Sequence, residues 1–315
     1  MTIKRICIIG GSGFVGRHLA HQLVERGYDV RLLTRDRERA KHLLVLPSAE
    51  VITANVHDRA ELARQFSGMD AVINLAGILH QSKKNSFDNT HVQLTQKVLD
   101  ACRATAVQRV LHMSALAATP NAPSAYLRSK AEAEKRVLAF QQAGSGETTI
   151  FRPSVIFGHG DSFINLFAKL IKILPVIALA CPKARFQPIH VDDVARAFAD
   201  SLDQASTFGQ AYNLCGPKIY TLRELITLIA ALLGKRRPIV GLGPRLSYLQ
   251  AWLMEWLPVK LLTRDNYFSM QVDSVCNCEF PFDFKPSSLE SVVPEYLAGT
   301  SRRGKYALFR NRAGR

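Results

Sequence analysis

Three side chains between residues 114 and 130 have the types and spacing of a proton-transfer site. Tyr126 and Lys130 are four residues apart in a stretch with a helical pattern, so their side chains share one face of the helix. An ammonium group beside a phenol lowers the pKa of the phenol, which can then exchange a proton with a carbonyl or an alcohol near neutral pH. Ser114 follows the expected strand 110–113 and would polarise the same oxygen. We therefore predict Ser114, Tyr126 and Lys130 as catalytic residues.

A glycine-rich segment follows the first apolar run of the chain. Residues 10–16, GGSGFVG, come directly after the expected strand 3–9 and open the expected helix 14–26. Glycines at positions 10, 13 and 16 allow a tight turn and a close approach of the backbone to a pyrophosphate, whose charge lies at the helix N-terminus. A structural turn is the alternative interpretation. We predict a dinucleotide site that includes Gly10, Gly13, Phe14, Val15 and Gly16.

The end of the second expected strand, residues 29–34, should distinguish NAD from NADP. Proteins that bind NAD often have an acidic residue there, which bonds to the ribose 2′-hydroxyl. This chain has Thr34 followed by Arg35, and a guanidinium can hold a 2′-phosphate with two hydrogen bonds. Arg39 lies one helical turn further on and would help, whereas Asp36 argues against a phosphate. We predict that Arg35 contacts the cofactor and that NADP(H) is favoured over NAD(H), a solvated charged turn being the other interpretation.

The first half of the chain alternates short β-branched segments with amphipathic helical ones. The expected strands are 3–9, 29–34, 51–54, 71–75, 109–113 and 148–155, and the expected helices include 14–26, 87–105 and 124–142. This alternation predicts an α/β fold, a Rossmann-type doubly wound parallel sheet with right-handed crossovers. Helical stretches separated by prolines after residue 158 indicate a smaller C-terminal α/β lobe. We expect a dinucleotide-binding domain at 1–157, to which later elements can return, a substrate or partner lobe at 158–299 and a basic tail at 300–315.

The composition describes a basic globular protein. Hydrophobic residues make up 47% of the 315 residues and charged residues 21%, which excludes a fibrous or wholly disordered chain. The net charge is +15, and six of the cations lie in the acid-free tail. This balance favours anionic partners: a phosphorylated cofactor, an anionic membrane surface, an acidic protein or nucleic acid. Because no segment resembles a nucleic-acid recognition fold, we do not expect nucleic acid as a partner.

The N-terminus and the cysteines indicate a cytoplasmic protein. Residues 1–5 lead straight into a strand without the apolar stretch and cleavage site of a signal peptide, and no apolar run reaches about 18 residues. The six cysteines lack the spacing of a disulfide-rich module, so we expect ordinary thiols. Cys276 and Cys278 have no second pair of cysteines or histidines nearby, and we therefore expect no metal site.

Most of the chain resembles the extended and atypical short-chain dehydrogenase/reductases, which are NAD-dependent epimerase/dehydratase-like. The matching segments are GGSGFVG at 10–16, NVHD at 55–58, NLAG at 74–77, HMSA at 112–115, Tyr126-x-x-x-Lys130, RPSVIFG at 152–158, HVDDVA at 190–195 and YNLCGP at 212–217. More narrowly, SAYLRSK at 124–130, RPSVIFG and LTRD at 262–265 make the chain similar to the NAD(P)H-binding accessory subunit of respiratory complex I and its bacterial relatives.

The resemblance implies roles for further residues. Asp58 is expected to contact the adenine ring, and Lys130 to hold the nicotinamide ribose. The cofactor is expected to lie along the NLAG segment and to have the start of RPSVIFG near its nicotinamide; the residues concerned are Leu75, Ala76, Gly77, Pro153 and Val155.

One position departs from the family pattern. Where many extended members have asparagine in the pattern Asn-x-x-Gly-Thr, this chain has His91 at the start of HVQLT. An imidazole there either relays protons in place of the amide or marks a site that no longer turns over. Ordinary helix packing is the third interpretation.

Two functions of different classes follow. The first is an NAD(P)H-binding protein of quinone and respiratory-chain oxidoreduction, an accessory or assembly factor of NADH:quinone oxidoreductase. It would have a membrane-complex protein as partner and lie peripherally at the inner membrane surface. The alternative is an active NADP(H)-dependent reductase or epimerase that uses Ser114, Tyr126 and Lys130 on an unidentified carbonyl, quinone or nucleotide sugar.

The stretch 246–262 is a candidate surface for a membrane or a partner. Trp252 and Trp256 lie one helical turn apart among leucines, a composition suited to a membrane interface or a protein contact. We nevertheless favour packing of this stretch in the core of the smaller lobe. The excess positive charge and the basic tail also predict peripheral association with anionic membranes.

Overall fold

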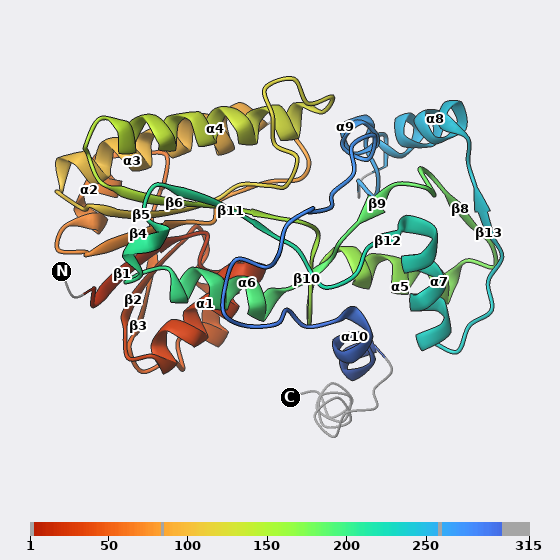
Figure 1. Ribbon diagram of the computed structural model, residues 1–315, viewed down its shortest axis with the longest axis horizontal. Coiled ribbons are helices and arrows are strands. Elements are labelled where there is room, and N and C mark those ends of the chain that lie inside the picture. The colour runs from red at the N-terminus through yellow and green to blue at the C-terminus, as the bar shows by residue number, and fades with distance from the viewer. Residues whose placement is uncertain (1–2, 83–84, 258–259, 298–315) are drawn as a thin grey trace. The chain divides into compact units, whose positions relative to one another are not determined.

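A sheet of parallel strands lies at the centre of the first part of the chain (Figure 1). In the computed structural model, which describes residues 3–82, 85–257 and 260–297, its order is β11-β6-β5-β4-β1-β2-β3. The strands are β1 (Arg5–Ile9), β2 (Asp29–Thr34), β3 (Ala49–Thr53), β4 (Ala71–Asn74), β5 (Arg109–Met113), β6 (Glu147–Pro153) and β11 (Gln210–Leu214). All of their pairings are parallel. The predicted doubly wound, Rossmann-type α/β fold is confirmed.

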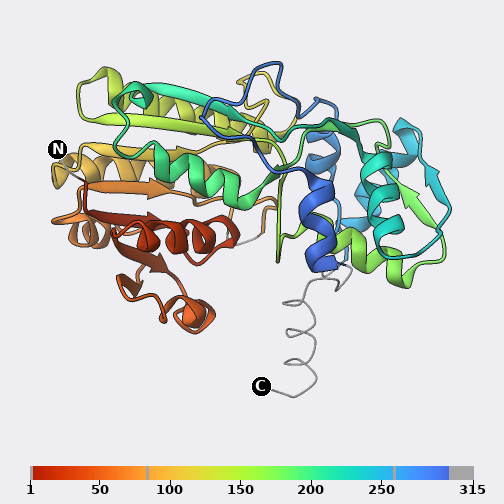
Figure 2. The same cartoon turned by 60° about the horizontal axis from the view of Figure 1, so that its bottom comes forward.

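Helices cover both faces of this sheet (Figures 1 and 2). On one face lie α2 (Arg59–Phe66), α3 (Leu94–Ala104) and α4 (Ala125–Gln142), whose buried Phe66, Leu99 and Phe140 pack against strand residues such as Ile9 and Val72. On the other face lie α1 (Phe14–Glu25) and α6 (Val191–Asp200). Because each face is covered, the strand residues are apolar on both sides, as in the run Ile6 to Ile9.

Residues 192–214 return to the first sheet after an excursion into the second half of the chain. The chain divides into two compact units, one of residues 1–153 and 192–214 and the other of 154–191 and 215–315. The buried Arg109 holds the returning segment, since its guanidinium donates to the carbonyls of Ser201 at 2.6 Å and Leu202 at 3.2 Å. A return of later elements to the first domain was expected, although β11 was not predicted as a strand, and the domain boundary at 157/158 stays a prediction. The tail at 300–315 lies outside the described residues.

The second unit is built from helices and short strand pairs. Its helices are α5 (Phe163–Ile173), α7 (Leu222–Leu232), α8 (Pro244–Met254), α9 (Arg264–Ser269) and α10 (Leu289–Leu297). The strand pairs are β7 (Ile156–Phe157) with β10 (Ile189–His190), β9 (Arg185–Phe186) with β12 (Tyr220–Thr221), and β8 (Ile177–Leu179) with β13 (Ile239–Gly241). Its core joins α5, α7 and α10. Across the described ranges, no helix combines the length and apolar character needed to cross a bilayer.

The cysteines differ from the expectation of ordinary thiols. Cys215 and Cys276 form a disulfide, with Cα atoms 6.1 Å apart. Cys7 and Cys102 are buried thiols, whereas Cys278 is an exposed one. The pair was missed because 61 residues separate the two cysteines, and their approach is decided by the fold of the second unit.

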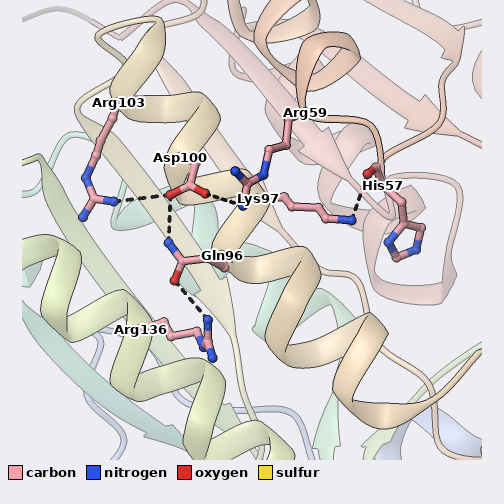
Figure 3. A network of polar contacts seen from close by, with 7 residues as sticks. All are labelled: His57, Arg59, Gln96, Lys97, Asp100, Arg103 and Arg136. Atoms are coloured by element: carbon pink, nitrogen blue, oxygen red, sulfur yellow. Dashed lines mark hydrogen bonds and ion pairs between the residues drawn. The ribbon is translucent and has the colours of Figure 1, made fainter.

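The outward surface of α3 is polar and bound to its neighbours by a network of charged groups (Figure 3). Asp100 pairs with Arg59 of α2 at 3.2 Å and accepts from the Gln96 amide at 2.8 Å. Gln96 in turn accepts from Arg136 of α4 at 3.1 Å, and Lys97 donates to the carbonyl of His57 at 2.9 Å. This surface therefore links α2, α3 and α4 through polar side chains.

Candidate cofactor and active site

The turn after β1 depends on glycine at two positions. Gly10 has a φ of +78°, which other residues rarely adopt, and a Cβ on it would lie 3.2 Å from the carbonyl carbon of Leu75. A Cβ on Gly16 would lie 2.5 Å from the carbonyl oxygens of Gly10 and Gly11. Gly13 donates its N–H to the Gly10 carbonyl at 3.0 Å. The loop therefore folds closely onto the first turn of α1, as the dinucleotide-binding prediction requires.

The N-terminus of α1 suits an anion. The helix begins at Phe14 after Gly13, and no side chain among the described residues caps it. The N–H groups of Phe14, Val15 and Gly16 thus have no side-chain acceptor, and the helix dipole adds partial positive charge at this end. A glycine cradle with an uncapped helix terminus fits the pyrophosphate of a dinucleotide.

Residues 74–77 connect the glycine loop to the candidate proton-transfer site. Leu75 continues the ladder between β1 and β4, because its N–H donates to the last carbonyl of β1 at 3.0 Å. The Asn74 side chain accepts from the N–H of Ala76 at 3.1 Å. A Cβ on Gly77 would lie 3.3 Å from Nζ of Lys130. The segment therefore extends from the glycine loop to Lys130, the path expected for a bound dinucleotide.

Arg35 is exposed directly after β2, next to the glycine loop. The Thr34 hydroxyl bonds to the Ser12 hydroxyl at 3.0 Å, which holds the end of β2 against that loop. Oδ1 of Asp36 accepts from the N–H of Glu38 at 3.0 Å, so this carboxylate is part of the following turn. Within the described residues, the Arg35 guanidinium makes no ion pair. The side chain of Arg39 is not described.

Ser114 presents a buried hydroxyl at the carboxyl end of β5. Its N–H donates to the carbonyl of Phe151 in β6 at 2.7 Å, which continues the sheet by one residue. Its Oγ is buried and has no hydrogen-bond partner in the described part of the chain. Since buried hydroxyls are nearly always paired, this oxygen suits a ligand that supplies the missing partner.

Lys130 reaches the same end of β5 from α4. Its Nζ donates to the carbonyl of Met113, the residue before Ser114, at 3.0 Å. Burial lowers the pKa of Lys130 to about 8, an effect that the nearby Glu134 carboxylate partly opposes. Tyr126 lies one turn earlier on α4, half-buried. The structure thus brings the side chain of Lys130 to the carbonyl of Met113, the residue before Ser114.

His91 occupies the position of the family's asparagine and is locked in place. It lies in a π-helical turn (Asp88–Gln93) that leads into α3, and its ring contacts Tyr126 edge-on with centroids 5.6 Å apart. Nε2 accepts from the N–H of Ile78 at 3.0 Å, and Nδ1 lies 2.8 Å from Oγ of Ser129. Because Ser129 donates its own proton to the Tyr126 carbonyl at 2.7 Å, Nδ1 of His91 must be the donor to Ser129.

The electrostatics of this position agree with a neutral ring. Burial, with the charge of Lys130 as a second cause, lowers the pKa of His91 to about 2. Both ring nitrogens are engaged and the ring stays uncharged near neutral pH. Of the interpretations left open, the geometry favours a structural role for His91, which holds the backbone of Ile78 next to Gly77.

Comparison with known proteins places this arrangement in a family. The model of the NAD dependent epimerase/dehydratase family matches residues 6–215, more than half of the chain. The chain belongs to this family. Its members bind an NAD(P) dinucleotide, which agrees with the glycine cradle after β1.

Two similar proteins are subunits of a respiratory enzyme. The 40 kDa subunit of mitochondrial NADH-ubiquinone oxidoreductase from Neurospora crassa is 27% identical over 258 residues, 80% of this chain and 67% of that protein. Subunit 9 of the mitochondrial NADH dehydrogenase (ubiquinone) 1 alpha subcomplex from Arabidopsis thaliana is 32% identical over 231 residues, 70% of this chain and 56% of that protein. The chain therefore spans between about half and two thirds of the length of these relatives.

A solved structure shows the same fold. The dTDP-glucose 4,6-dehydratase DesIV from Streptomyces venezuelae, with NAD and TYD bound, superposes with a TM-score of 0.74 and 21% identity. The match covers 96% of this chain and 98% of that one. At this identity the likeness concerns the epimerase/dehydratase fold alone.

Three residues predicted to contact the cofactor, Asp58, Pro153 and Val155, have structural contacts of their own. Oδ1 of Asp58 accepts from the N–H groups of Ala60 and Glu61, at 2.9 and 3.3 Å, and so caps α2. A contact of Asp58 with adenine stays a prediction. Pro153 ends β6 in the first unit, whereas Val155 belongs to the second unit and packs against its core. Their contact with the nicotinamide stays a prediction too.

Sequence reasoning missed two polar residues of this site. Ser129 joins His91 to α4, and the buried His112 lies 3.4 Å from the Asn74 amide through its Nδ1. Burial lowers the pKa of His112 to about 3, and the charge of Lys130 adds to the effect. A signal was present for His112, because strand residues two apart, such as His112 and Ser114, share a face. In the described residues, no cluster of three or more His, Cys, Asp or Glu side chains is placed to hold a metal.

Proposed function

We propose that this chain is an NAD(P)H-binding accessory subunit or assembly factor of an NADH:quinone oxidoreductase. In this role the bound nucleotide stabilises the fold and an interface with the membrane complex. The relatives named as subunits of NADH-ubiquinone oxidoreductase support the proposal. The observation that carries it is the locked, neutral His91 beside Tyr126.

The argument rests on the fate of the proton. An enzyme that uses Tyr126 as an acid must return the proton to the phenol after each cycle. Near neutral pH the His91 ring has no nitrogen available to accept this proton, because its Nε2 lone pair is bound to the N–H of Ile78 and its Nδ1 donates to Ser129; burial, which lowers its pKa, acts in the same direction. A nucleotide site that lacks this proton relay is suited to binding the nucleotide as a structural ligand, without catalytic turnover. At a nucleotide concentration of 100 times Kd, binding would stabilise the fold by about 2.7 kcal/mol.

We further propose that the nucleotide is NADP(H), with NAD(H) as the alternative. Arg35 supports this choice because it is exposed beside the glycine loop and makes no ion pair in the described residues. A guanidinium–phosphate contact contributes about 1.5–3 kcal/mol, so NADPH should bind at least about tenfold more tightly than NADH. The variant Arg35→Asp should lose this preference in a fluorescence titration, whereas the control Arg37→Asp should retain it. Equal affinities of wild type for the two nucleotides would refute the assignment.

The test of the proposed function is whether the bound nucleotide turns over. Purified protein is examined by native mass spectrometry for a copurified nucleotide, then loaded with NADPH and offered quinones, aldehydes or nucleotide sugars. We expect a raised melting temperature with NADPH but no oxidation of it. The variant Gly16→Val serves as a control that should not bind NADPH. Its Cβ would lie 2.5 Å from the carbonyl oxygens of the glycine loop and would distort that loop. Turnover in the ordinary range of enzymes, about 1–10³ s⁻¹, would overturn the accessory role.

A second function is supported by Ser114. Its buried, unpartnered hydroxyl suits a substrate oxygen, which favours an active NADP(H)-dependent reductase or epimerase acting on a carbonyl, quinone or nucleotide sugar. The nicotinamide would supply or accept the hydride. Ser114 would orient the substrate oxygen and Tyr126 would exchange a proton with it, while Lys130 would stabilise the phenolate and hold the nicotinamide ribose.

The proposed place of the protein is the inner membrane surface, as a peripheral component beside a membrane-complex partner. Its relatives are named as mitochondrial respiratory subunits, and its net charge is +15. Anionic phospholipids attract such a surface, each cation contributing on the order of 1 kcal/mol. Nucleic acid is not among the partners that we propose.

A further inference from the structure

Helix α8 of the second unit has its small residues inside and its large apolar residues outside. Ser247 and Ala251, one turn apart, are the buried residues of the helix. Ser247 is fixed by two hydrogen bonds, since its Oγ accepts from the N–H of Cys181 and donates to the carbonyl of Leu242, both at 3.2 Å. This is the reverse of an ordinary amphipathic helix, whose large apolar residues form the core. The expectation that this stretch packs in the core of the smaller lobe is therefore wrong.

The outward face of α8 and of the turn that follows it is apolar. The exposed apolar residues are Leu246, Tyr248, Leu249, Trp252, Leu253, Trp256 and Leu257. Trp256 is 78% exposed and Leu253 is 55% exposed, so these side chains are not covered by their own unit. Arg245 lies two turns before Trp252 on the same face of the helix, given 100° of rotation per residue. A contiguous apolar surface of this kind marks a place of interaction.

The helix cannot easily turn this face inward. The Gln250 amide donates to the carbonyl of Ala178 in β8 at 2.9 Å. Glu255 accepts from the N–H of Arg264 at 2.6 Å and pairs with its guanidinium at 2.9 Å, which joins α8 to α9 (Figure 1). The apolar face is therefore displayed by a helix held at both ends.

The charge around α8 indicates what covers it. The cations on α8 and in the described segment that follows it are Arg245, Lys260 and Arg264, and the acids are Glu255, which pairs with Arg264, and Asp265. The outward surface of α3 has no such combination, because polar groups such as Asp100 and Gln96 occupy it (Figure 3). An exposed apolar face with two indoles and the exposed Arg245 suits the boundary between anionic headgroups and acyl chains, where indoles and basic side chains are favoured.

We propose that α8 is the element by which this protein docks on an anionic phospholipid bilayer, its outward face entering the headgroup region. The indoles and leucines would lie at the level of the upper acyl chains, and Arg245 would extend toward the lipid phosphates. This inference adds a lipid-binding surface to the membrane location in the proposed function. It does not depend on nucleotide binding, since the surface belongs to the second unit.

The chain contains its own probe for a test. Trp252 and Trp256 are its two tryptophans, so indole fluorescence reports on α8 and the turn that follows it. The full-length protein is mixed with vesicles of phosphatidylcholine, with or without an equimolar amount of phosphatidylglycerol, whose acyl chains are brominated near the headgroup. We expect a blue shift and quenching with the anionic vesicles, and release by about 0.5 M salt through screening. A chain that ends at Gly299 should retain the quenching.

Two charge-matched variants decide whether the face is responsible. Leu249→Glu with Leu253→Glu keeps both indoles. It should weaken partitioning into the vesicles more than about tenfold, because two leucine side chains that the bilayer would bury are lost. Val45→Glu with Ile219→Glu places the same charges at exposed apolar positions elsewhere and should bind vesicles more tightly than the first variant. A cooperative urea unfolding transition with a midpoint close to that of wild type verifies that each variant is folded.

The outcomes show whether the basic tail, the α8 face on a lipid bilayer or the α8 face on a protein partner is responsible for binding. Sedimentation of the full-length chain with anionic vesicles without quenching would mean that the tail binds and α8 does not. If neither sedimentation nor quenching occurs, the α8 face would instead bind a protein partner. If pure phosphatidylcholine quenches the indoles equally, anionic lipid is not required. Each of these results overturns the proposal. Failure of NADPH binding would refute the proposed function while leaving the quenching result intact.

Discussion

Replacing Lys130 by methionine should stabilise the nucleotide-free protein while damaging its site. Lys130 is 4% exposed and its pKa is lowered from 10.5 to about 8, chiefly by burial. The difference between these pKa values corresponds to about 3 kcal/mol, the cost of keeping the ammonium charged in the folded protein. Methionine removes that cost but leaves the carbonyl of Met113 without its hydrogen bond, which costs about 1–3 kcal/mol. We expect a net stabilisation of about 0–2 kcal/mol near pH 7.

The pH dependence provides a second, independent signature. Because the pKa of Lys130 is lower in the folded protein, the folded protein loses this proton above about pH 8 while the unfolded chain keeps it up to about 10.5. The unfolded state then binds more protons, and this group makes the free energy of unfolding rise with pH over that window. The rise should be absent in Lys130→Met.

Urea unfolding of the nucleotide-free protein at about pH 7 and about pH 9.5 measures both effects. Lys135→Met is the matched control, since Lys135 is exposed on the same helix and should change stability by less than about 0.5 kcal/mol. Affinity for NADPH should fall in Lys130→Met and persist in Lys135→Met. A Lys130→Met variant that is less stable than wild type near pH 7 and keeps the wild-type pH profile would refute the reasoning.

Three further predictions concern other parts of the molecule. If the chain turns over a substrate, Tyr126→Phe should abolish turnover and leave the Kd for NADPH nearly unchanged, and full activity in this variant would remove the proton-transfer role. His91 has its pKa lowered to about 2, so the unfolded chain takes up a proton below about pH 6.5 that the folded protein excludes. The contribution of His91 to stability should therefore fall by up to about 1.4 kcal/mol per pH unit on acidification, and urea unfolding of His91→Asn should show a shallower acid slope. Cys215→Ser should lower the free energy of unfolding by about 2–4 kcal/mol under oxidising conditions and have little effect with reductant, which urea unfolding with and without dithiothreitol will test.

Much of the first unit could be predicted because its signals are local. Residues 29–34 and 109–113 have the bounds expected from their apolar patterns. Such patterns depend only on neighbouring residues and on the periods of strand and helix. The glycine loop is local as well, since the collisions that exclude a side chain at Gly16 come from Gly10 and Gly11.

The partners of the site residues were decided by the tertiary structure. His91 was expected in one helix over 87–105, but a π-helical turn precedes α3 there and directs the ring to Ile78 and Ser129. Arg109 is another case, because its acceptors at Ser201 and Leu202 come from a segment more than 90 residues away. No local pattern encodes which distant carbonyl will face a given donor.

Helix α8 shows the limit most clearly. The sequence by itself determined that 246–257 is apolar and helical and that it contains both tryptophans of the chain. It did not determine which face would be covered, because a buried helix and an exposed one of the same composition follow the same local rules. In the structure the inward positions are held by the small Ser247 and Ala251, while the indoles remain outside. Burial depends on whether other segments supply a complementary surface, and that is a property of the whole fold.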